Sequence, residues 1–172
     1  MWFCGLSGSG KTTISMALQQ QLVQEGYEVV VFDGDVVRKG ISKDLGFSPE
    51  DRTENIFRVA QACKNVSQRG VLAISATISP YESHRVMAGE MLGDTMKCIY
   101  LDASLQVCQD RDVKGLYAKA MAGEITNFTG VSDIFEPPQH PDLVLHTGQD
   151  SVEVCVRKLY QFLCRDVLGT TP

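Results

Sequence analysis

The chain has 172 residues, of which 44% are hydrophobic and 22% are charged, and this composition suits one compact domain with a sizeable core rather than a disordered chain. The 16 basic and 21 acidic residues leave a formal net charge of −5, which argues against a general nucleic-acid binder or a membrane-surface protein. No apolar run approaches the roughly 18 residues of a membrane span, and we expect a cytoplasmic location.

Five short apolar runs are predicted to be β-strands, and amphipathic patterns separate them. The runs are residues 1–4, 27–33, 71–77, 96–102 and 142–147. Several of them are mostly apolar, as in a sheet that helices cover on both sides. Because strands alternate with helices, we expect a three-layer α/β fold with a mainly parallel five-stranded sheet, built by residues 1–172 as a single domain.

Three apolar stripes with helical spacing predict the longest helices. The first stripe follows a glycine-rich turn and ends at Gly26. The second begins with Ser48 as N-cap and Pro49 in the first turn, and it ends at Gly70. The third covers residues 152–163 near the C-terminal end. Each helix would pack its stripe against one face of the sheet.

The stretch GLSGSGKT, from Gly5 to Thr12, matches the pattern G-x-x-x-x-G-K-[ST] between a predicted strand and a predicted helix. Glycines let the backbone wrap a phosphate with its N–H groups, and the helix adds the positive end of its dipole. Lys11 would meet the β- and γ-phosphates, and the Thr12 hydroxyl would bind Mg²⁺. The alternative is a glycine-rich turn that matches by chance. The position of the motif between a predicted strand and a predicted helix favours a P-loop that binds a nucleoside triphosphate.

Polar residues follow the second predicted strand in the stretch DGDVVR. Asp33 and Asp35 lie at its carboxyl end, where ligands bind in parallel sheets, and Arg38 follows shortly after. Asp33 could approach the Mg²⁺ ion or an attacking hydroxyl, and Arg38 could meet an anion. The alternative is a helix N-cap with a solvated arginine. The sequence lacks the N-K-x-D pattern by which GTPases recognise their base, which argues against a GTPase.

The stretch LGFSPEDRTENIFR combines three residue types that suit a flat base with an attached anion. Arg52 and Asn55 are spaced to share one face of the second predicted helix, and Phe47 precedes them. An aromatic ring, a guanidinium and an amide can stack on a base, pair with an anion and hydrogen-bond. Alternatively, Phe47 is only a hydrophobic staple at the helix start.

Residues 111–140 form the least regular part of the chain, with glycines inside the segment and paired prolines near its end. A long segment of this kind is typical of a lid or a binding loop. The alternative is a loop that only packs on the surface. We expect a lid at roughly residues 111–140.

Two residue types show no sign of a metal site. The six cysteines form no C-x-x-C pair, and His84, His140 and His146 lack the spacing of metal ligands. We therefore expect reduced, buried thiols and incidental histidines. Trp2 is expected in the core or an interface rather than as a platform for a base.

Six stretches of the chain resemble adenylylsulfate kinases (APS kinases) in their order and spacing. They are GLSGSGKTT, DGDVVR, LGFSPEDRTEN, ISPY, RDVKGLYAKA and FTG. Many families share the P-loop, whereas DGDVVR, ISPY and RDVKGLY together are specific. The resemblance implies a P-loop kinase fold and transfer of the ATP γ-phosphoryl group to the 3′-hydroxyl of adenosine 5′-phosphosulfate (APS). The products would be PAPS and ADP, formed in sulfate assimilation.

The resemblance also implies two nucleotide sites in one cleft. ATP would contact Gly5, Leu6, Ser7, Gly8, Ser9, Gly10, Lys11, Thr12, Thr13 and Arg111. APS would contact Asp33, Gly34, Asp35, Arg38, Phe47, Arg52, Asn55, Ile78, Ser79, Lys114, Asn127 and Phe128. Phe47 and Phe128 would enclose the adenine of APS, while Arg38 and Arg52 would hold its phosphosulfate.

By the same resemblance, catalysis would rest on two lysines and two aspartates. Lys11 and Lys114 would offset charge on the transferring group. Asp33 is expected to orient or deprotonate the 3′-hydroxyl, and Asp35 could share this task, since the sequence alone does not separate the two. The cofactor would be Mg²⁺, held by Thr12 and Asp33.

Three positions depart from the family pattern, and a fourth carries a modification in some members. Asn127 stands where glycine is more frequent, Thr77 where an aromatic residue is commoner, and Glu82 where an arginine is frequent. We expect none of these changes to abolish activity, because the other charged positions are present. Ser79 is a candidate phosphoserine.

Two other readings of the P-loop stay open at this point. One is a different small-molecule kinase, of the adenylate or gluconate type, and the other is a catalytically idle nucleotide-binding module. The family resemblance implies a homodimer, and the net negative charge argues against nucleic acid or a membrane as a partner. The resemblance also leaves open whether the chain is a minimal kinase or one domain fused to or associated with ATP sulfurylase.

Overall fold

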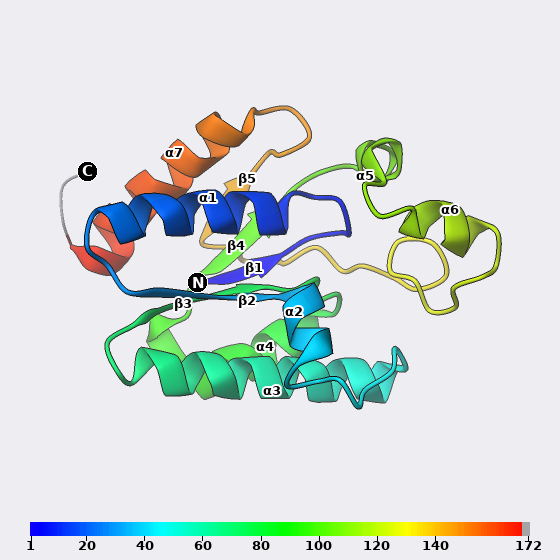
Figure 1. The fold of residues 1–172 in the computed structure, drawn as a ribbon, viewed down its shortest axis with the longest axis horizontal. Coiled ribbons are helices and arrows are strands. Elements are labelled where there is room, and N and C mark those ends of the chain that lie inside the picture. The colour runs from blue at the N-terminus through cyan, green and yellow to red at the C-terminus, as the bar shows by residue number, and fades with distance from the viewer. Residues whose placement is uncertain (170–172) are drawn as a thin grey trace.

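The computed structural model describes residues 1–169 and contains a five-stranded sheet in which neighbouring strands are parallel (Figure 1). The strands are β1 Trp2–Cys4, β2 Val29–Asp33, β3 Leu72–Ala76, β4 Cys98–Leu101 and β5 Leu143–Leu145. Their order is β2-β3-β1-β4-β5, so β1 lies in the centre. All five predicted strands are confirmed, and each is slightly shorter than predicted, as expected for strand ends.

Helices cover both faces of the sheet (Figure 1). They are α1 Lys11–Gln24, α2 Gly34–Lys39, α3 Pro49–Ser67, α4 Glu82–Leu92, α5 Leu105–Arg111, α6 Leu116–Met121 and α7 Val152–Leu163, with a 3₁₀ turn η1 Gly93–Thr95 and a π-helical turn η2 Cys164–Leu168. α1 and α7 pack on one face, and α3 and α4 pack on the other. This arrangement confirms the predicted three-layer α/β fold.

The core has two halves, and the central strand β1 contributes to both. Phe3 packs with Ile14 of α1 and Leu159 of α7 on one face of the sheet. Trp2, which is only 1% exposed, packs with Val59 of α3 on the other face. Successive strand side chains point to opposite faces, so two adjacent aromatic residues can anchor both layers. The expected core position of Trp2 is thereby confirmed.

The second predicted helix, α3, begins as the sequence indicates. The Ser48 hydroxyl accepts the Asp51 backbone N–H at 3.1 Å, and Pro49 is the first helical residue. α4, by contrast, was not predicted. Its buried face carries His84 and Arg85, so the helix lacks a continuous apolar stripe.

The segment predicted as a lid leaves α5 beyond the carboxyl end of the sheet and returns to β5 (Figure 1). It contains α6 and an isolated β-bridge between Thr129 and Asp133. Tyr117 and Phe128 pack edge to face with their ring centroids 5.0 Å apart, next to the buried Cys108. These side chains belong to a small apolar cluster that joins the segment to Cys108 of α5 and to Leu6 of the connection that follows β1.

The cysteines behave as predicted. All six are buried and free, and Cys4 and Cys98 bring their sulfur atoms to 4.0 Å between β1 and β4. Among the residues that the structure describes, no helix combines the length and the apolar composition that crossing a bilayer requires.

Candidate active site

A cavity of about 930 Å³ opens at the carboxyl ends of the strands, between the P-loop, the connection from β2 to α3 and the lid segment. Most predicted nucleotide contacts line it: Ser7, Gly8, Ser9, Gly10, Lys11, Thr12, Thr13, Asp33, Gly34, Asp35, Arg38, Phe47, Arg52, Asn55, Ile78, Ser79, Arg111, Lys114, Asn127 and Phe128. Gly5 and Leu6 are the exceptions, because Gly5 is buried behind the loop and Leu6 packs against the lid cluster. The volume is near the upper end for small-molecule sites.

The P-loop needs glycine where it leaves β1 and where it enters α1. A Cβ atom added to Gly5 would lie 2.8 Å from the Leu101 carbonyl oxygen of β4, closer than such atoms approach in proteins. Gly10 has φ 96° and is the N-cap of α1, a left-handed conformation that favours glycine. The backbone can therefore turn tightly from the central strand into α1.

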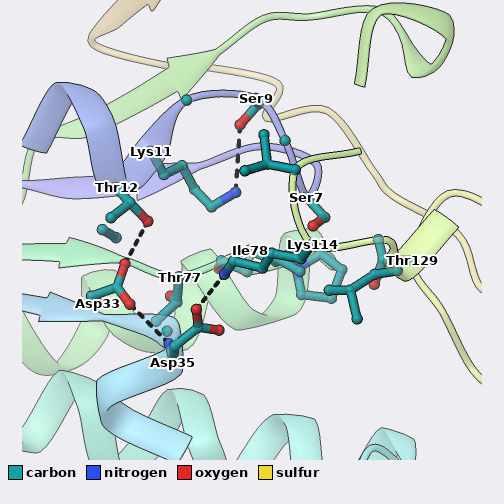
Figure 2. Close-up of a pocket in the computed structure, with 18 of the residues that line it drawn as sticks. Ser7, Ser9, Lys11, Thr12, Asp33, Asp35, Thr77, Ile78, Lys114 and Thr129 are labelled. Atoms are coloured by element: carbon teal, nitrogen blue, oxygen red, sulfur yellow. Dashed lines mark hydrogen bonds and ion pairs between the residues drawn. The ribbon is translucent and has the colours of Figure 1, made fainter. Parts of the chain in front are cut away.

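Lys11 folds back over the loop and is buried. Its Nζ donates hydrogen bonds to the carbonyl oxygens of Gly5 at 2.9 Å and Leu6 at 2.7 Å, and Figure 2 shows it pointing toward Ser9. Burial lowers the pKa of Lys11 to about 8. Phosphate oxygens entering the loop are acceptors that can replace these carbonyls.

Thr12, Asp33 and Asp35 form a hydrogen-bonded chain beside the P-loop (Figure 2). The Thr12 hydroxyl donates to Asp33 Oδ2 at 2.5 Å, and Asp33 Oδ1 accepts the Asp35 backbone N–H at 3.0 Å. Asp33 is therefore the N-cap of α2, as the alternative reading of the sequence proposed. The same carboxylate also faces the cavity, so capping α2 fixes it beside Thr12.

The oxygen atoms of Thr12 and Asp33 suit a magnesium ion that phosphates also bind. Residues 1–169 contain no group of three or more His, Cys, Asp or Glu side chains placed to hold a metal. Mg²⁺ in kinases is usually held by one or two protein oxygens together with substrate phosphates and water. The Thr12 hydroxyl and the Asp33 carboxylate, whose oxygens lie 2.5 Å apart, offer two such protein oxygens. Phosphates and water would supply the remaining ligands.

The lid contacts both walls of the cavity. Lys114 forms an ion pair with Asp35 (Figure 2). The Tyr117 hydroxyl donates to the Ser7 carbonyl oxygen at 2.9 Å. A hydrogen bond from the Tyr117 backbone also lowers the pKa of Asp112, which caps the start of α6. At the end of α5, Arg111 donates to the Gly8 carbonyl oxygen at 3.1 Å. In this arrangement the lid rests on the P-loop and on α2.

Arg52 is buried and joins α3 to the lid. Its Nε donates to the Phe47 carbonyl oxygen at 3.1 Å and its Nη1 to the Thr129 hydroxyl at 3.1 Å. The guanidinium also hydrogen-bonds the Asn127 carbonyl oxygen and lies 3.5 Å from the Asp133 carboxylate. The sequence predicted an anion ligand at this position, and the structure adds that Arg52 holds the lid segment against α3.

The other residues predicted for APS surround the same end of the cavity. Phe47 is 56% exposed, and the Arg38 guanidinium lies 4.6 Å from its ring centroid. Arg38 also donates to the Gly46 carbonyl oxygen at 2.5 Å, so it is not the freely solvated arginine of the alternative reading. Phe128 is buried on the lid, and the Asn55 Oδ1 atom has no hydrogen-bond partner among the described residues.

The turn after β3 is strained and closely held. Ser79 has φ 47° and is 1% exposed, and its hydroxyl accepts the Trp2 indole N–H at 3.2 Å. Such a conformation costs a non-glycine residue about 1–3 kcal/mol. The neighbouring Ile78 carbonyl oxygen accepts the Gly5 backbone N–H at 3.3 Å. A phosphate on Ser79, which the family resemblance suggests, would be attached to the oxygen that accepts the Trp2 N–H.

The three departures from the family pattern have local explanations. Asn127 has φ 53°, and asparagine is the residue after glycine that best tolerates this region. Thr77 is buried, and its hydroxyl lies 3.1 Å from that of Ser75. Glu82 forms an ion pair with Arg85 at 2.5 Å, so its charge is compensated within α4.

Several cavity residues were not predicted. Thr147, Asp150, Val152 and Cys155 line the end next to Arg111, whose Nη2 donates to the Thr147 carbonyl oxygen at 2.6 Å. Their only signal in the sequence is a position after the last strand, where ligands bind in parallel sheets. Lys39, Thr129 and Asp112 also line the cavity.

Comparisons with known proteins agree on one family. The family model of adenylylsulphate kinase matches residues 1–146. An adenylyl-sulfate kinase from Halothermothrix orenii is 49% identical over 163 residues, which are 95% of this chain and 88% of that protein.

Solved structures agree with the sequence comparison. An APS kinase from Mycobacterium tuberculosis, solved in complex with AMPPNP and APS, superposes with a TM-score of 0.91 at 39% identity and covers 94% of this chain and 95% of that one. A gluconokinase from Sinorhizobium meliloti superposes with a TM-score of 0.65 at 16% identity, over 98% of this chain and 93% of its own, which shows a shared fold alone.

Proposed function

Because the chain belongs to the adenylylsulphate kinase family, a class of ATP-dependent enzymes that phosphorylate APS, we propose that the cavity at the carboxyl ends of the strands binds ATP and APS together. The reaction moves the γ-phosphoryl group of ATP to the 3′-hydroxyl of APS and yields PAPS and ADP. The observation that carries the proposal is the continuity of the cavity, which runs from the P-loop to Phe47 and Phe128 past Asp33 and Asp35.

ATP occupies the end formed by the P-loop. Backbone N–H groups of residues 7–13 and the start of α1 surround its phosphates, and the Lys11 ammonium faces the β- and γ-phosphates. The base extends toward Arg111 and Thr147, which close this end of the cavity. The orientation places the γ-phosphoryl group toward Asp33 and Asp35.

APS occupies the opposite end. Phe47 and Phe128 offer aromatic surfaces for its adenine, and stacking on one aromatic ring contributes about 1–3 kcal/mol per base in other nucleotide binders. Arg38 and Arg52 supply the positive charge for the phosphosulfate. Asn55 has a buried, unpartnered oxygen among the described residues and can accept a hydrogen bond from the base or ribose. The ribose then points its 3′-hydroxyl toward the P-loop.

The residues of this chain carry out catalysis by positioning and charge. Phosphoryl transfer has a loose transition state, so alignment of the two oxygens and neutralisation of charge dominate. Asp33 or Asp35 orients the 3′-hydroxyl and accepts its proton. Lys11 and Lys114 offset the charge that develops around the transferring group. The lid over the cavity excludes water, which suppresses ATP hydrolysis.

Thr12 and Asp33 hold the Mg²⁺ ion that accompanies ATP. When bound, this ion supplies positive charge to the phosphate oxygens. The hydrogen bond between the Thr12 hydroxyl and Asp33 keeps both oxygens together before the nucleotide enters. Asp33 can also retain its role as N-cap of α2, because one of its oxygens bonds the Asp35 N–H.

The proposal is tested by APS-dependent release of ADP from ATP with Mg²⁺. Lys11→Ala and Asp33→Ala should each reduce turnover by at least about 10²-fold, since each removes charge stabilisation or nucleophile positioning. Lys43→Ala and Asp94→Ala are matched controls, because both side chains are exposed and lie outside the cavity. Unchanged turnover in Lys11→Ala and Asp33→Ala would remove the proposed roles. ATP binding without any turnover in the wild type would instead support an idle module.

The remaining assignments follow from the family alone. Homodimerisation, a cytoplasmic location, phosphorylation of Ser79 and a fused or associated ATP sulfurylase stay predictions. A sedimentation measurement of the purified chain tests the first, and mass spectrometry of the purified chain tests the phosphoserine.

A further inference from the structure

Arg85 of α4 is a buried guanidinium that lies outside the cavity and has no part in the proposed chemistry. Its Nε donates to the Glu82 carboxylate at 3.0 Å. Its Nη1 donates to the Ser79 carbonyl oxygen at 2.6 Å, and its Nη2 donates to the Glu136 carbonyl oxygen at 2.5 Å. One side chain thus connects α4 with two backbone segments, at Ser79 and at Glu136, that are far apart in the sequence.

Both of these segments shape the end of the cavity assigned to APS. Ser79 belongs to the strained turn that lines this end of the cavity together with Ile78, and the Ile78 carbonyl oxygen also accepts the Gly5 N–H at the start of the P-loop. Glu136 follows the part of the lid that carries Phe128, and its backbone N–H bonds the Pro80 carbonyl oxygen at 2.8 Å. The Glu136 carboxylate also accepts the Glu82 backbone N–H at 2.6 Å. The end of the lid segment at Glu136, called the lid exit below, is therefore bound to the Ser79 turn and to Glu82, the first residue of α4.

The ion pair alone does not explain this arrangement. The Glu82 carboxylate accepts hydrogen bonds from only part of the Arg85 guanidinium. The guanidinium also donates to the carbonyl oxygens of Ser79 and Glu136, and no other side chain of the described residues donates to these two oxygens. Ser79 keeps a positive φ although it is not glycine, and such conformations persist only where the surroundings impose them. Within the described residues, the side chains of Arg85 and Trp2 both hydrogen-bond Ser79.

We propose that Arg85 is a positioning residue that sets the distance between the Ser79 turn and the lid exit, and thereby the affinity for APS. The inference rests on the proposed function, since it assigns these walls to APS. It predicts a selective effect, because the hydrogen bonds that Arg85 forms within the described residues go to Glu82, Ser79 and Glu136, none of which is assigned to ATP. A residue with a merely structural role would change stability and leave the two substrates equally affected.

The test compares the KM values for APS and for ATP in Arg85→Lys. A lysine ammonium can reach one of the two carbonyl oxygens but lacks the planar fork that spans both. The KM for APS should rise about tenfold, a size typical of losing a hydrogen bond from a charged group, while the KM for ATP stays within about twofold. Glu82→Gln is the matched control, because it weakens the ion pair and leaves both carbonyl contacts in place. It should lower the midpoint of thermal unfolding without changing the ratio of the two KM values.

A double-mutant cycle with Ser79→Gly tests whether Arg85 acts through the strained turn. Glycine adopts φ 47° without strain. In the Ser79→Gly variant the turn therefore does not depend on Arg85 to keep residue 79 in this conformation. The increase in KM for APS caused by Arg85→Lys should therefore be smaller in the Ser79→Gly background. Equal effects in both backgrounds would mean that Arg85 does not act through Ser79, and would overturn the proposal.

Three outcomes separate this inference from the proposed function. If the wild type shows no APS-dependent turnover, the proposed function fails. If the wild type is active and Arg85→Lys leaves the ratio of KM values unchanged, the positioning role of Arg85 fails alone. If Arg85→Lys does not fold, Arg85→Met combined with Glu82→Gln removes both charges, and the same ratio measured on that variant decides the question.

Discussion

Lys114 of the lid and Asp35 of α2 form an ion pair across the cavity, 79 residues apart in the chain (Figure 2). Both side chains are exposed, and ion pairs of this kind contribute no more than about 1 kcal/mol. Such a weak contact can be exchanged for one with nucleotide phosphates. The pair therefore places Lys114 close to its proposed point of action before the substrates bind.

Replacement of Lys114 tests this role in catalysis. Lys114→Ala should lower kcat by about 10–10²-fold, because a charge that acts on the transferring group is lost, while the KM for ATP changes little. Lys119→Ala is the matched control, since Lys119 is an exposed lysine of α6 outside the cavity lining. Equal kcat values for the two variants would show that Lys114 does not act on the reacting phosphates.

The buried Lys11 predicts how ATP binding depends on pH. Burial lowers the pKa of Lys11 to about 8, so the free enzyme loses this positive charge as the pH rises through about 8. Binding of a non-hydrolysable ATP analogue should weaken progressively from about pH 7 to about pH 9, an interval on the order of one unit either side of that pKa. Lys11→Met should bind weakly and show no such dependence. Parallel pH profiles for the two proteins would contradict this assignment.

His84 predicts how stability depends on pH. Burial lowers the pKa of His84 to about 4, and the positive charges of Arg85 and Arg52 contribute in the same direction. Between about pH 6.5 and 4 the unfolded chain takes up a proton that the folded chain does not, so stability is lost as the pH falls through this window.

Urea unfolding at pH 7 and pH 4.5 measures this loss. In the wild type, His84 should account for about 2 kcal/mol of the decrease between these values, and His84→Asn should lack that part. His140→Asn is the control, because His140 is exposed and makes no hydrogen bond in the described structure. If His84→Asn and His140→Asn lose stability to the same extent, His84 does not remain neutral in the folded state.

Much of the fold and of the site could be predicted from the sequence. Five strands, the P-loop and the Ser48 N-cap of α3 are local patterns, and all of them are confirmed. The P-loop also predicted that the nucleotide site lies at the carboxyl edge of the sheet, and the cavity lies at this edge.

Other features depend on contacts between distant residues. α4 was missed because His84 and Arg85 replace apolar residues on its buried face. Arg52 was predicted to bind an anion, but its bonds to Asn127 and Thr129 on the lid connect residues about 75 positions apart, and no local pattern reports them.

Asn127 offers a test of how the backbone shapes the lid. It has φ 53°, and its carbonyl oxygen accepts a hydrogen bond from Arg52. Asn127→Val should strain this position by about 1–2 kcal/mol and raise the KM for APS severalfold. Asn127→Gly should have a smaller effect, because glycine adopts the same φ without strain. A larger loss in the glycine variant than in the valine variant would argue that the side chain, and not the backbone, matters.

Phe47 tests the assignment of the APS end. Phe47→Ala should raise the KM for APS about tenfold and leave the KM for ATP unchanged, since stacking on one ring contributes about 1–3 kcal/mol. Phe57→Ala is the control, because Phe57 is an exposed aromatic residue of α3 outside the cavity lining. A Phe47→Ala variant that loses affinity for ATP but not for APS would reverse the assignment of the two ends.

The most direct test of the central claim follows the γ-phosphoryl group itself. The wild-type chain is incubated with APS, Mg²⁺ and ATP labelled at the γ-phosphate, and the labelled product is identified. We predict that the label appears on the 3′-oxygen of the APS product, in equal amount to the ADP released. Label found only as inorganic phosphate, or label transferred to AMP or gluconate but not to APS when each acceptor is supplied in a parallel reaction, would contradict the account.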